Sequence, residues 1–201
     1  MGDNSRNKEI TFRRMAEASI PILSEFDPPH LSNLIFAYGL AEYIPKSKFE
    51  DGSTFFDALA LEVIPNLKQL NSHDLSNMLW AYANAKASNP RLFEETAETV
   101  IALNLLQSFH PRDISNMMWA YATAKEQHPQ LLKEVADHIV ALHGLDEFKP
   151  EELSNLVWAY STADELHPKL FRKVARHICP RNNLAEFAPQ ALSNIVWAYA
   201  T

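Results

Sequence analysis

Cysteine, glycine and long apolar runs are scarce in this chain, and each scarcity argues against a class of protein. A single cysteine, Cys179, has no partner for an internal disulfide, so the sequence indicates a reducing intracellular compartment. The four glycines form no glycine-rich loop of the kind that cradles phosphates. No apolar run approaches the roughly 18 residues of a transmembrane helix, so we expect no membrane insertion.

Positive charge is also in deficit. The chain holds 18 lysines and arginines against 25 aspartates and glutamates, which gives a net charge of −7. A protein with this balance has no global positive field that would attract nucleic acid or anionic lipid. Any binding to such partners must therefore use a local patch.

Motifs for catalysis or metal binding are missing as well. The eight histidines show neither an HExxH motif nor a Cys–His metal spacing, and no serine or cysteine occupies a nucleophile elbow. His128 and His167 each precede a proline that opens a helix, so we interpret them as capping or turn residues. We predict no enzymatic activity, no cofactor and no metal.

What the chain does contain is one motif in five copies. They are LSNLIFAYG from Leu31, LSNMLWAYA from Leu75, ISNMMWAYA from Ile114, LSNLVWAYS from Leu153 and LSNIVWAYA from Leu192. The asparagines of the last four copies are 39 residues apart, and those of the first two are 44 apart. A fixed period in this range is typical of a solenoid.

Each repeat unit is predicted to hold two helices. Helix A contains the motif, and helix B is amphipathic and opens at Pro90, Pro129 or Pro168. The predicted fold is all-α: a right-handed α-solenoid of about five tandem helix-turn-helix repeats of about 39 residues. Seven extra residues in the first unit fall around IPKSKFEDGS and should form a loop.

We expect one repeat domain over residues 1–201. It opens with a half unit at 7–20, in which Phe12, Met15 and Ala16 align with Leu132, Val135 and Ala136 of a later helix B. Further units start near residues 28, 72, 111, 150 and 189, and the last is incomplete. Because terminal repeats need polar capping, we expect further repeats or a partner to cover the end of the array.

The helical phase of the motif separates its core from a free stripe. On the third copy the residues opposite the apolar face are Arg112, Asn116, Ala120, Thr123 and Gln127. Helix A must then form the inner row of two layers, with this stripe on the concave side. The repeated tyrosine has core phase, and its hydroxyl is a candidate for fixing the geometry between repeats. The repeated tryptophan lies at the margin, where it either wedges between units or stacks on a base.

Three sets of stripe residues are candidates for ligand binding. The first is the invariant asparagine, which either hydrogen-bonds the next unit or holds a ligand's backbone: Asn33, Asn77, Asn116, Asn155 and Asn194. Selectivity must come from two columns that vary, because identical residues cannot distinguish bases. One column is Pro29, His73, Arg112, Glu151 and Gln190, and the other is Leu40, Asn84, Thr123, Thr162 and Thr201. The alternative is a solvated surface that is free to vary.

Charge on the predicted B helices is uneven. The helix opened by Pro168 is basic, whereas the one opened by Pro90 is acidic. The basic residues are Lys169, Arg172, Lys173 and Arg176, followed by Arg181. Because helix B should form the outer row, we interpret this segment as a solvated face or a partner contact and not as a phosphate track.

The repeated LSNxxWAYA, with PxxL before it and PxLF after it, resembles the octotricopeptide and heptatricopeptide type of organellar helical-hairpin repeat proteins. Related repeats precede the RAP domain in the family named for the Fas-activated serine/threonine kinase. The resemblance implies single-stranded RNA binding in organellar RNA maturation, stability or translation, in a chloroplast or a mitochondrion, although no transit peptide is identifiable. The alternative is a protein-binding scaffold, a subunit of a larger organellar assembly.

Overall fold

The chain is described here by a computed structural model that covers residues 2–45, 52–87, 89–165, 167–180, 184 and 186–201, with side chains from residue 7 onward. Every regular element in these ranges is a helix, so the all-α prediction is confirmed. The extra loop predicted around residues 44–53 depends on residues 46–51, which lie outside the described ranges, as does Arg181. The chain divides into two compact units, Met1–Thr96 and Ala97–Thr201.

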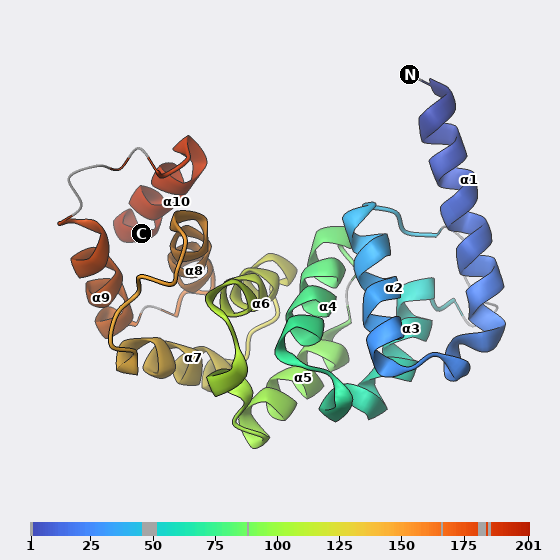
Figure 1. Cartoon of the computed structure of the whole chain (residues 1–201), viewed down its shortest axis with the longest axis horizontal. Coiled ribbons are helices and arrows are strands. Elements are labelled where there is room, and N and C mark those ends of the chain that lie inside the picture. Colours follow the sequence, from blue (N-terminus) through green and yellow to red (C-terminus); the bar gives the residue numbers. More distant parts are fainter. Residues whose placement is uncertain (1, 46–51, 88, 166, 181–183, 185) are drawn as a thin grey trace. The chain divides into compact units, whose positions relative to one another are not determined.

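The first unit contains the helices up to the start of α5 (Figure 1). They are α1 (Gly2–Ser19), α2 (Pro28–Leu40), α3 (Phe55–Val63), α4 (Ser72–Ala85) and the beginning of α5 (Pro90–Ala102), with two 3-10 helices, η1 (Ile20–Glu25) and η2 (Ile64–Gln69). The A helices α2 and α4 pack side by side, and α3 contacts α2. Neighbours in sequence are thus neighbours in space, as in an α-solenoid.

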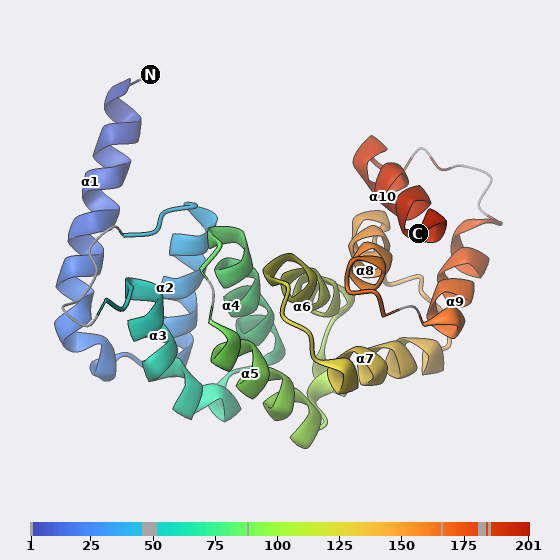
Figure 2. The same ribbon diagram turned by 180° about the vertical axis from the view of Figure 1, so that it is seen from behind.

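The second unit repeats this arrangement (Figure 2). Its elements are the remainder of α5, η3 (Leu105–Ser108), α6 (Pro111–Ala124), α7 (Pro129–Ala141), α8 (Pro150–Thr162), α9 (Pro168–Ile178) and α10 (Pro189–Ala200). The A helices α6, α8 and α10 form a closely packed row, whereas the B helices α7 and α9 touch at few positions. This difference places the B helices on the wider, outer side of this unit.

Proline and histidine define where the helices begin. Seven of the α-helices in the described ranges start with a proline, at a position where its missing N–H has no cost. At α7 and α9 the ring Nδ1 of the preceding histidine accepts the backbone N–H three residues on, at 3.1 Å for His128 and 3.3 Å for His167. The predicted capping role of these histidines is confirmed.

The A helices end on residues in the left-handed backbone region. Glu42, Lys86, Lys125 and Asp164 have φ between 50° and 59°. The residue after each donates its N–H to the carbonyl of the repeated tyrosine, as Glu126 does to Tyr121 at 3.0 Å. This bond closes the helix in the way that glycine usually allows, but a side chain here is strained.

Replacing such a residue by glycine should therefore stabilise the protein. We expect Lys125→Gly to raise the free energy of unfolding by about 1 kcal/mol, because glycine has no Cβ to strain at positive φ. Urea denaturation measures the change. The control is Lys133→Gly on the exposed face of α7, which should lower stability by about 1 kcal/mol. A Lys125→Gly variant as destabilised as the control would contradict the strain argument.

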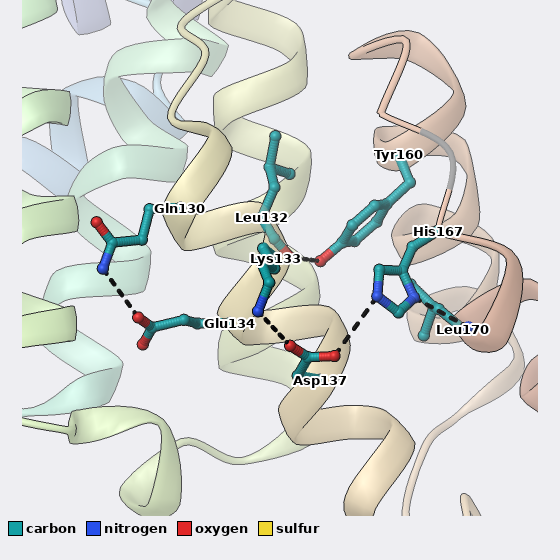
Figure 3. Close-up of polar contacts among 8 residues, drawn as sticks. All are labelled: Gln130, Leu132, Lys133, Glu134, Asp137, Tyr160, His167 and Leu170. Atoms are coloured by element: carbon teal, nitrogen blue, oxygen red, sulfur yellow. Dashed lines mark hydrogen bonds and ion pairs between the residues drawn. The ribbon is translucent and has the colours of Figure 1, made fainter.

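On α4, α8 and α10 the repeated tyrosine joins the A helix to the preceding B helix, as Figure 3 shows for Tyr160 and Leu132. The Tyr160 hydroxyl donates to the Leu132 carbonyl at 2.5 Å, and Tyr199 donates to the Phe171 carbonyl at 2.7 Å. In the first unit Tyr82 donates to Phe56 in the same way. The proposed role of the hydroxyl in setting the geometry between helices is therefore confirmed.

The helix α1 takes part in the same scheme. Tyr38 donates to the carbonyl of Phe12 at 2.7 Å, and the two rings meet edge to face with centroids 5.1 Å apart. The hydrogen bond between Tyr38 and Phe12 thus corresponds to the one between Tyr160 and Leu132. The half unit read from the sequence packs on α2 as a B helix packs on the following A helix.

Neighbouring A helices are joined by the serine of the motif. The Ser32 hydroxyl donates to the carbonyl of Asp74 at 3.0 Å. In the second unit Ser115 donates to Glu152 at 3.0 Å and Ser154 to Ala191 at 3.2 Å. All three serines are at most 2% exposed. A buried hydroxyl paired with a carbonyl of the next A helix at the same place in these three repeats fixes the register of the helices that it joins.

Two turns further along, small residues let the A helices approach closely. Gly39 faces Ala81 so tightly that a Cβ on Gly39 would lie 2.4 Å from the Ala81 Cβ. At the corresponding place in the second unit the Ser161 hydroxyl donates to the carbonyl of Ala198 at 2.7 Å. The alanine of the motif therefore faces the preceding A helix in these two pairs, at positions where a larger side chain would separate the helices.

Candidate nucleic-acid interface

The open side of the A helices is a stripe of four positions, at i, i+4, i+7 and i+11 from the start of the helix. On α6 these are Arg112, Asn116, Trp119 and Thr123, and on α8 they are Glu151, Asn155, Trp158 and Thr162; all eight are half-buried or exposed. We call these positions, with their counterparts on the other A helices, the A-helix stripe. Because α6, α8 and α10 lie side by side, equivalent positions in this unit form parallel rows.

Two residues assigned to the open side from the sequence, Ala120 and Asn77, are in fact buried. Ala120 is 0% exposed, and Ala159 at the same place on α8 is also 0% exposed. The placement of Ala120 on the free stripe was wrong, because this alanine belongs to the close contacts within the row of A helices. The open face of α6 therefore includes Trp119 in place of Ala120.

The first variable column is accessible along its whole length. Its members Pro29, His73, Arg112, Glu151 and Gln190 are all exposed. Near the first member, His30 and Asn33 line an open groove of about 570 Å³ in the first unit, together with Ile22, Phe26 and Leu34. In the second unit the column carries a positive, a negative and a neutral side chain, Arg112, Glu151 and Gln190, so it has no continuous charge of one sign.

The members of the second variable column differ in exposure and in hydrogen bonding, although all were predicted to lie on the open stripe. Thr162 and Thr201 are exposed, but the Asn84 amide donates to the Gly39 carbonyl at 3.0 Å and helps to join α4 to α2. The Thr123 hydroxyl is enclosed and has no hydrogen-bond partner among the described residues. Of this column Leu40, Thr162 and Thr201 are exposed, and the two threonines are the exposed members that carry a hydrogen-bonding group.

The repeated asparagine does not form the ladder, because the adjacent serine does. Asn77 is the exception among the five: it is 8% exposed, and its Nδ2 lies 2.9 Å from His73 Nε2. The amides that hydrogen-bond no other group in the described part of the chain belong to Asn33, Asn116, Asn155 and Asn194. An ordered row of amides with unused donors and acceptors suits a ligand better than it suits packing.

The tryptophans lie beside these amides, one helical turn further on. Trp119 and Trp158 are half-buried, and Trp197 is 45% exposed. In the first unit Phe36 and Trp80 at the same place approach to 5.6 Å between ring centroids. Phe36 and Trp80 thus pack between neighbouring A helices, as one of the two predicted roles requires, and the partial exposure of Trp119, Trp158 and Trp197 is compatible with the other.

Sequence reasoning missed the serine ladder and the membership of tryptophan in the stripe. The sequence did contain a signal for the serine, because all five copies of the motif contain the Ser-Asn pair and not the asparagine alone. A helical wheel shows which residues share a face, but it does not show which of two adjacent polar residues meets a neighbouring helix.

The described residues offer neither a metal site nor a membrane span. Among these residues no group of three or more His, Cys, Asp and Glu side chains is arranged to hold a metal ion. Within the same ranges, no helix combines the length and apolarity needed to span a membrane.

Comparison with known proteins identifies the family. A family model described as RNA-editing substrate-binding complex 6 protein matches residues 48–201, which include every helix from α3 to α10. No curated protein matches the chain. The relationship to octotricopeptide, heptatricopeptide and RAP-domain proteins stays a prediction. Because the match covers most of the sequence, this chain belongs to the RNA-editing substrate-binding complex 6 protein family.

Proposed function

We propose that this chain is a helical-repeat subunit of an RNA-editing substrate-binding complex and that its A-helix stripe binds single-stranded RNA. The observation that carries the proposal is the row of unpaired asparagine amides on α6, α8 and α10, each one turn from a partly exposed tryptophan. No catalytic step and no cofactor is part of the proposal.

The chemistry of the stripe matches the demands of single-stranded RNA. Unstacked bases gain about 1 to 3 kcal/mol each by stacking on aromatic rings, and Trp158 or Trp197 supplies such a ring. An amide offers both a donor and an acceptor to a ribose, a phosphate or a base edge. The exposed residues that differ between repeats, Arg112, Glu151 and Gln190, would supply preference among bases.

Size and charge set the strength of this binding. If each repeat contacts about one nucleotide, as in other helical-repeat readers, five copies of the motif would hold about five. The net charge of −7 opposes the approach of RNA. We therefore propose that other subunits of the complex contribute to affinity.

A protein-binding scaffold is the second candidate, and one feature favours it. On α10 the residues Val196, Trp197 and Tyr199 are 69%, 45% and 43% exposed, whereas their counterparts Val157 and Tyr160 on α8 are at most 1% exposed. Exposed apolar side chains of this kind suit a protein contact. The two candidate surfaces share Trp197, whereas Val196 and Tyr199 lie outside the A-helix stripe.

The test is binding to a fluorescent single-stranded RNA of about ten nucleotides, within the range of known site sizes. Asn155→Ala removes an amide with no structural role and should weaken binding about threefold to tenfold. Trp158→Ala should weaken it by about tenfold or more. Circular dichroism checks that both variants remain helical.

The matched control is Leu61→Ala, which removes an apolar side chain that is 64% exposed on α3, outside the stripe. It should leave RNA affinity unchanged. If Asn155→Ala and Trp158→Ala behave like this control while the wild-type chain binds RNA, the stripe is not the RNA site. A chain that binds no RNA at low salt would favour the scaffold.

The cellular location follows from the same proposal. Of the two organelles that the sequence allowed, we propose the mitochondrion, where complexes of this kind act. Fractionation of cells that express the tagged protein tests this, and a chloroplast or cytosolic signal would contradict it.

A further inference from the structure

A basic groove lies between the outer helices α7 and α9. Its lining consists of Val140 from α7 and Lys169, Arg172, Lys173 and Arg176 from α9, and it has a volume of about 470 Å³. The sequence analysis interpreted this segment as a solvated face or a partner contact and not as a phosphate track, and it did not anticipate a groove. Four cations around one depression stand out in a chain whose net charge is −7.

Lys173 is held at the wall of the groove by the end of α7. Its ammonium donates to the carbonyl of Val140 at 3.0 Å and to the carbonyl of Leu142. These carbonyls belong to the C-terminal turn of the helix, where such groups lack intrahelical partners. Lys173 therefore serves the fold, and Lys169, Arg172 and Arg176 are the cations available to a ligand.

The acidic groups of α7 do not pair with Arg172 or Arg176. Asp137 accepts a hydrogen bond from Lys133 at 2.8 Å and lies 3.5 Å from His167 Nε2, and Glu134 accepts one from Gln130 (Figure 3). Among the described residues, no carboxylate forms an ion pair with Arg172 or Arg176. The bond from Lys133, and to a lesser extent the charges of His167 and Lys169, lower the pKa of Asp137.

The three cations follow one another along one face of α9. Lys169, Arg172 and Arg176 are separated by three and four residues, which corresponds to about 4.5 and 6 Å along the helix axis. Arginine binds phosphate through two parallel N–H groups in a fixed fork, which makes it the preferred residue for phosphate recognition. The face therefore presents cations at successive turns to an extended anion.

The lining also shows which part of a nucleic acid would fit. Among the described residues that line it, there is no aromatic ring on which a base could stack and no side-chain amide that could read a base edge. Its apolar content is limited to Val140 and the stems of the long side chains, so it lacks the buried anchor on which protein interfaces depend. These features favour a phosphodiester backbone over an acidic protein segment.

We propose that the groove between α7 and α9 binds the phosphate backbone of single-stranded RNA, independently of its sequence, as a second contact separate from the A-helix stripe. The proposal rests on the proposed function in one respect, namely that the chain binds RNA. It assigns backbone affinity to the B helices and base contacts to the A helices.

The test uses the double variant Arg172→Gln/Arg176→Gln in the full chain. Its matched control is Arg13→Gln/Arg14→Gln on α1, which makes the same change in net charge on another exposed helix face. Two fluorescent probes are titrated: a single-stranded RNA of about ten nucleotides and an abasic ribose-phosphate strand of equal length. Each titration is done between about 50 mM and about 200 mM salt.

The groove variant should bind both probes about tenfold more weakly than the wild-type chain at the lower salt. Its plot of log affinity against log salt should be shallower by about 1.4, because each lost phosphate contact removes about 0.7 from a single-strand slope. The control should change affinity less than twofold. Circular dichroism of both variants shows that the exposed substitutions leave the helices intact.

Other results overturn the inference and separate it from the stripe. If the groove variant matches the control on both probes while Asn155→Ala weakens RNA binding, the stripe is supported and the groove is not. If the groove variant loses RNA affinity and Asn155→Ala and Trp158→Ala do not, the groove is supported and the stripe is not. Loss of binding to a poly-glutamate peptide with unchanged RNA affinity would identify a protein site instead, and a wild-type chain that binds neither probe would overturn both.

Discussion

Raising the pH from 10 to above about 12 should unfold the helical repeats, and the ionisation of tyrosine should coincide with the loss of helix. Burial raises the pKa of Tyr38 and of Tyr199 from 10.0 to about 12. Burial likewise raises the pKa of Tyr82 and of Tyr160 well above the ordinary value. Each of these hydroxyls donates to a backbone carbonyl of a B helix, which a phenolate cannot do.

The sign follows from linkage between ionisation and folding. A group whose pKa is higher in the folded chain than in the unfolded chain stabilises the fold below the unfolded pKa, here about 10. That stabilisation is lost as the pH rises through the folded value, which is about 12 for Tyr38 and Tyr199. Four such bonds distributed over both units should make the loss cooperative within each unit.

Two optical signals measured on one sample test this prediction. Absorbance of the phenolate reports ionisation, and circular dichroism reports helix content. Phenolate formation near pH 10 by these tyrosines with the helices intact would contradict it. As a control, Tyr160→Phe should be less stable at neutral pH by about 1 to 3 kcal/mol, since the buried Leu132 carbonyl loses its donor, and less sensitive to alkali.

The second large effect is expected at the contact between α2 and α4. Gly39→Ala should lower the free energy of unfolding by about 1 to 3 kcal/mol, because its Cβ would lie 2.4 Å from the Ala81 Cβ and 2.5 Å from the Ala81 Cα. The backbone of one helix must move to relieve this overlap. The movement would also stretch the Ser32–Asp74 and Asn84–Gly39 hydrogen bonds, which join the same two helices.

The matched control for this substitution is Gly144→Ala. The added Cβ would meet the Asp146 carboxylate at 2.8 Å, but that side chain is exposed and can rotate away. Stability should change by less than about 0.5 kcal/mol. Urea denaturation of both variants measures the difference, and equal effects would show that α2 and α4 are not held as closely as the structure indicates.

Much of the fold could be predicted because each repeat contains prolines that mark where its helices begin. Prolines at 111, 129, 150, 168 and 189 mark helix starts, and each of them opens a helix in the structure. The tyrosine could be assigned to the core from its phase alone. Its hydroxyl bond followed from the rule that buried hydroxyl groups find partners.

The stripe could be predicted less well, because it depends on contacts between helices. The helical wheel placed Ala120 on the open side of α6. In the structure Ala120 is buried and Trp119 is partly exposed, so the open side includes Trp119 and not Ala120. The wheel also could not distinguish Ser154 from Asn155 as the residue that bonds the neighbouring A helix. Adjacent residues differ by 100° in phase, so a modest rotation of the packed helix exchanges their roles.

The sequence by itself determined that this protein is a row of helical hairpins, where their helices begin, and which residues vary between repeats. These properties are local, since they follow from proline positions, periodicity and repetition along the chain. The packing of the helices was needed to show that serine joins neighbouring A helices, that the asparagine amides other than that of Asn77 are unpaired within the described residues, and that the cations of α9 surround a groove with Val140. Those outcomes depend on how closely neighbouring helices approach, which small residues such as Gly39 and Ala81 set through packing.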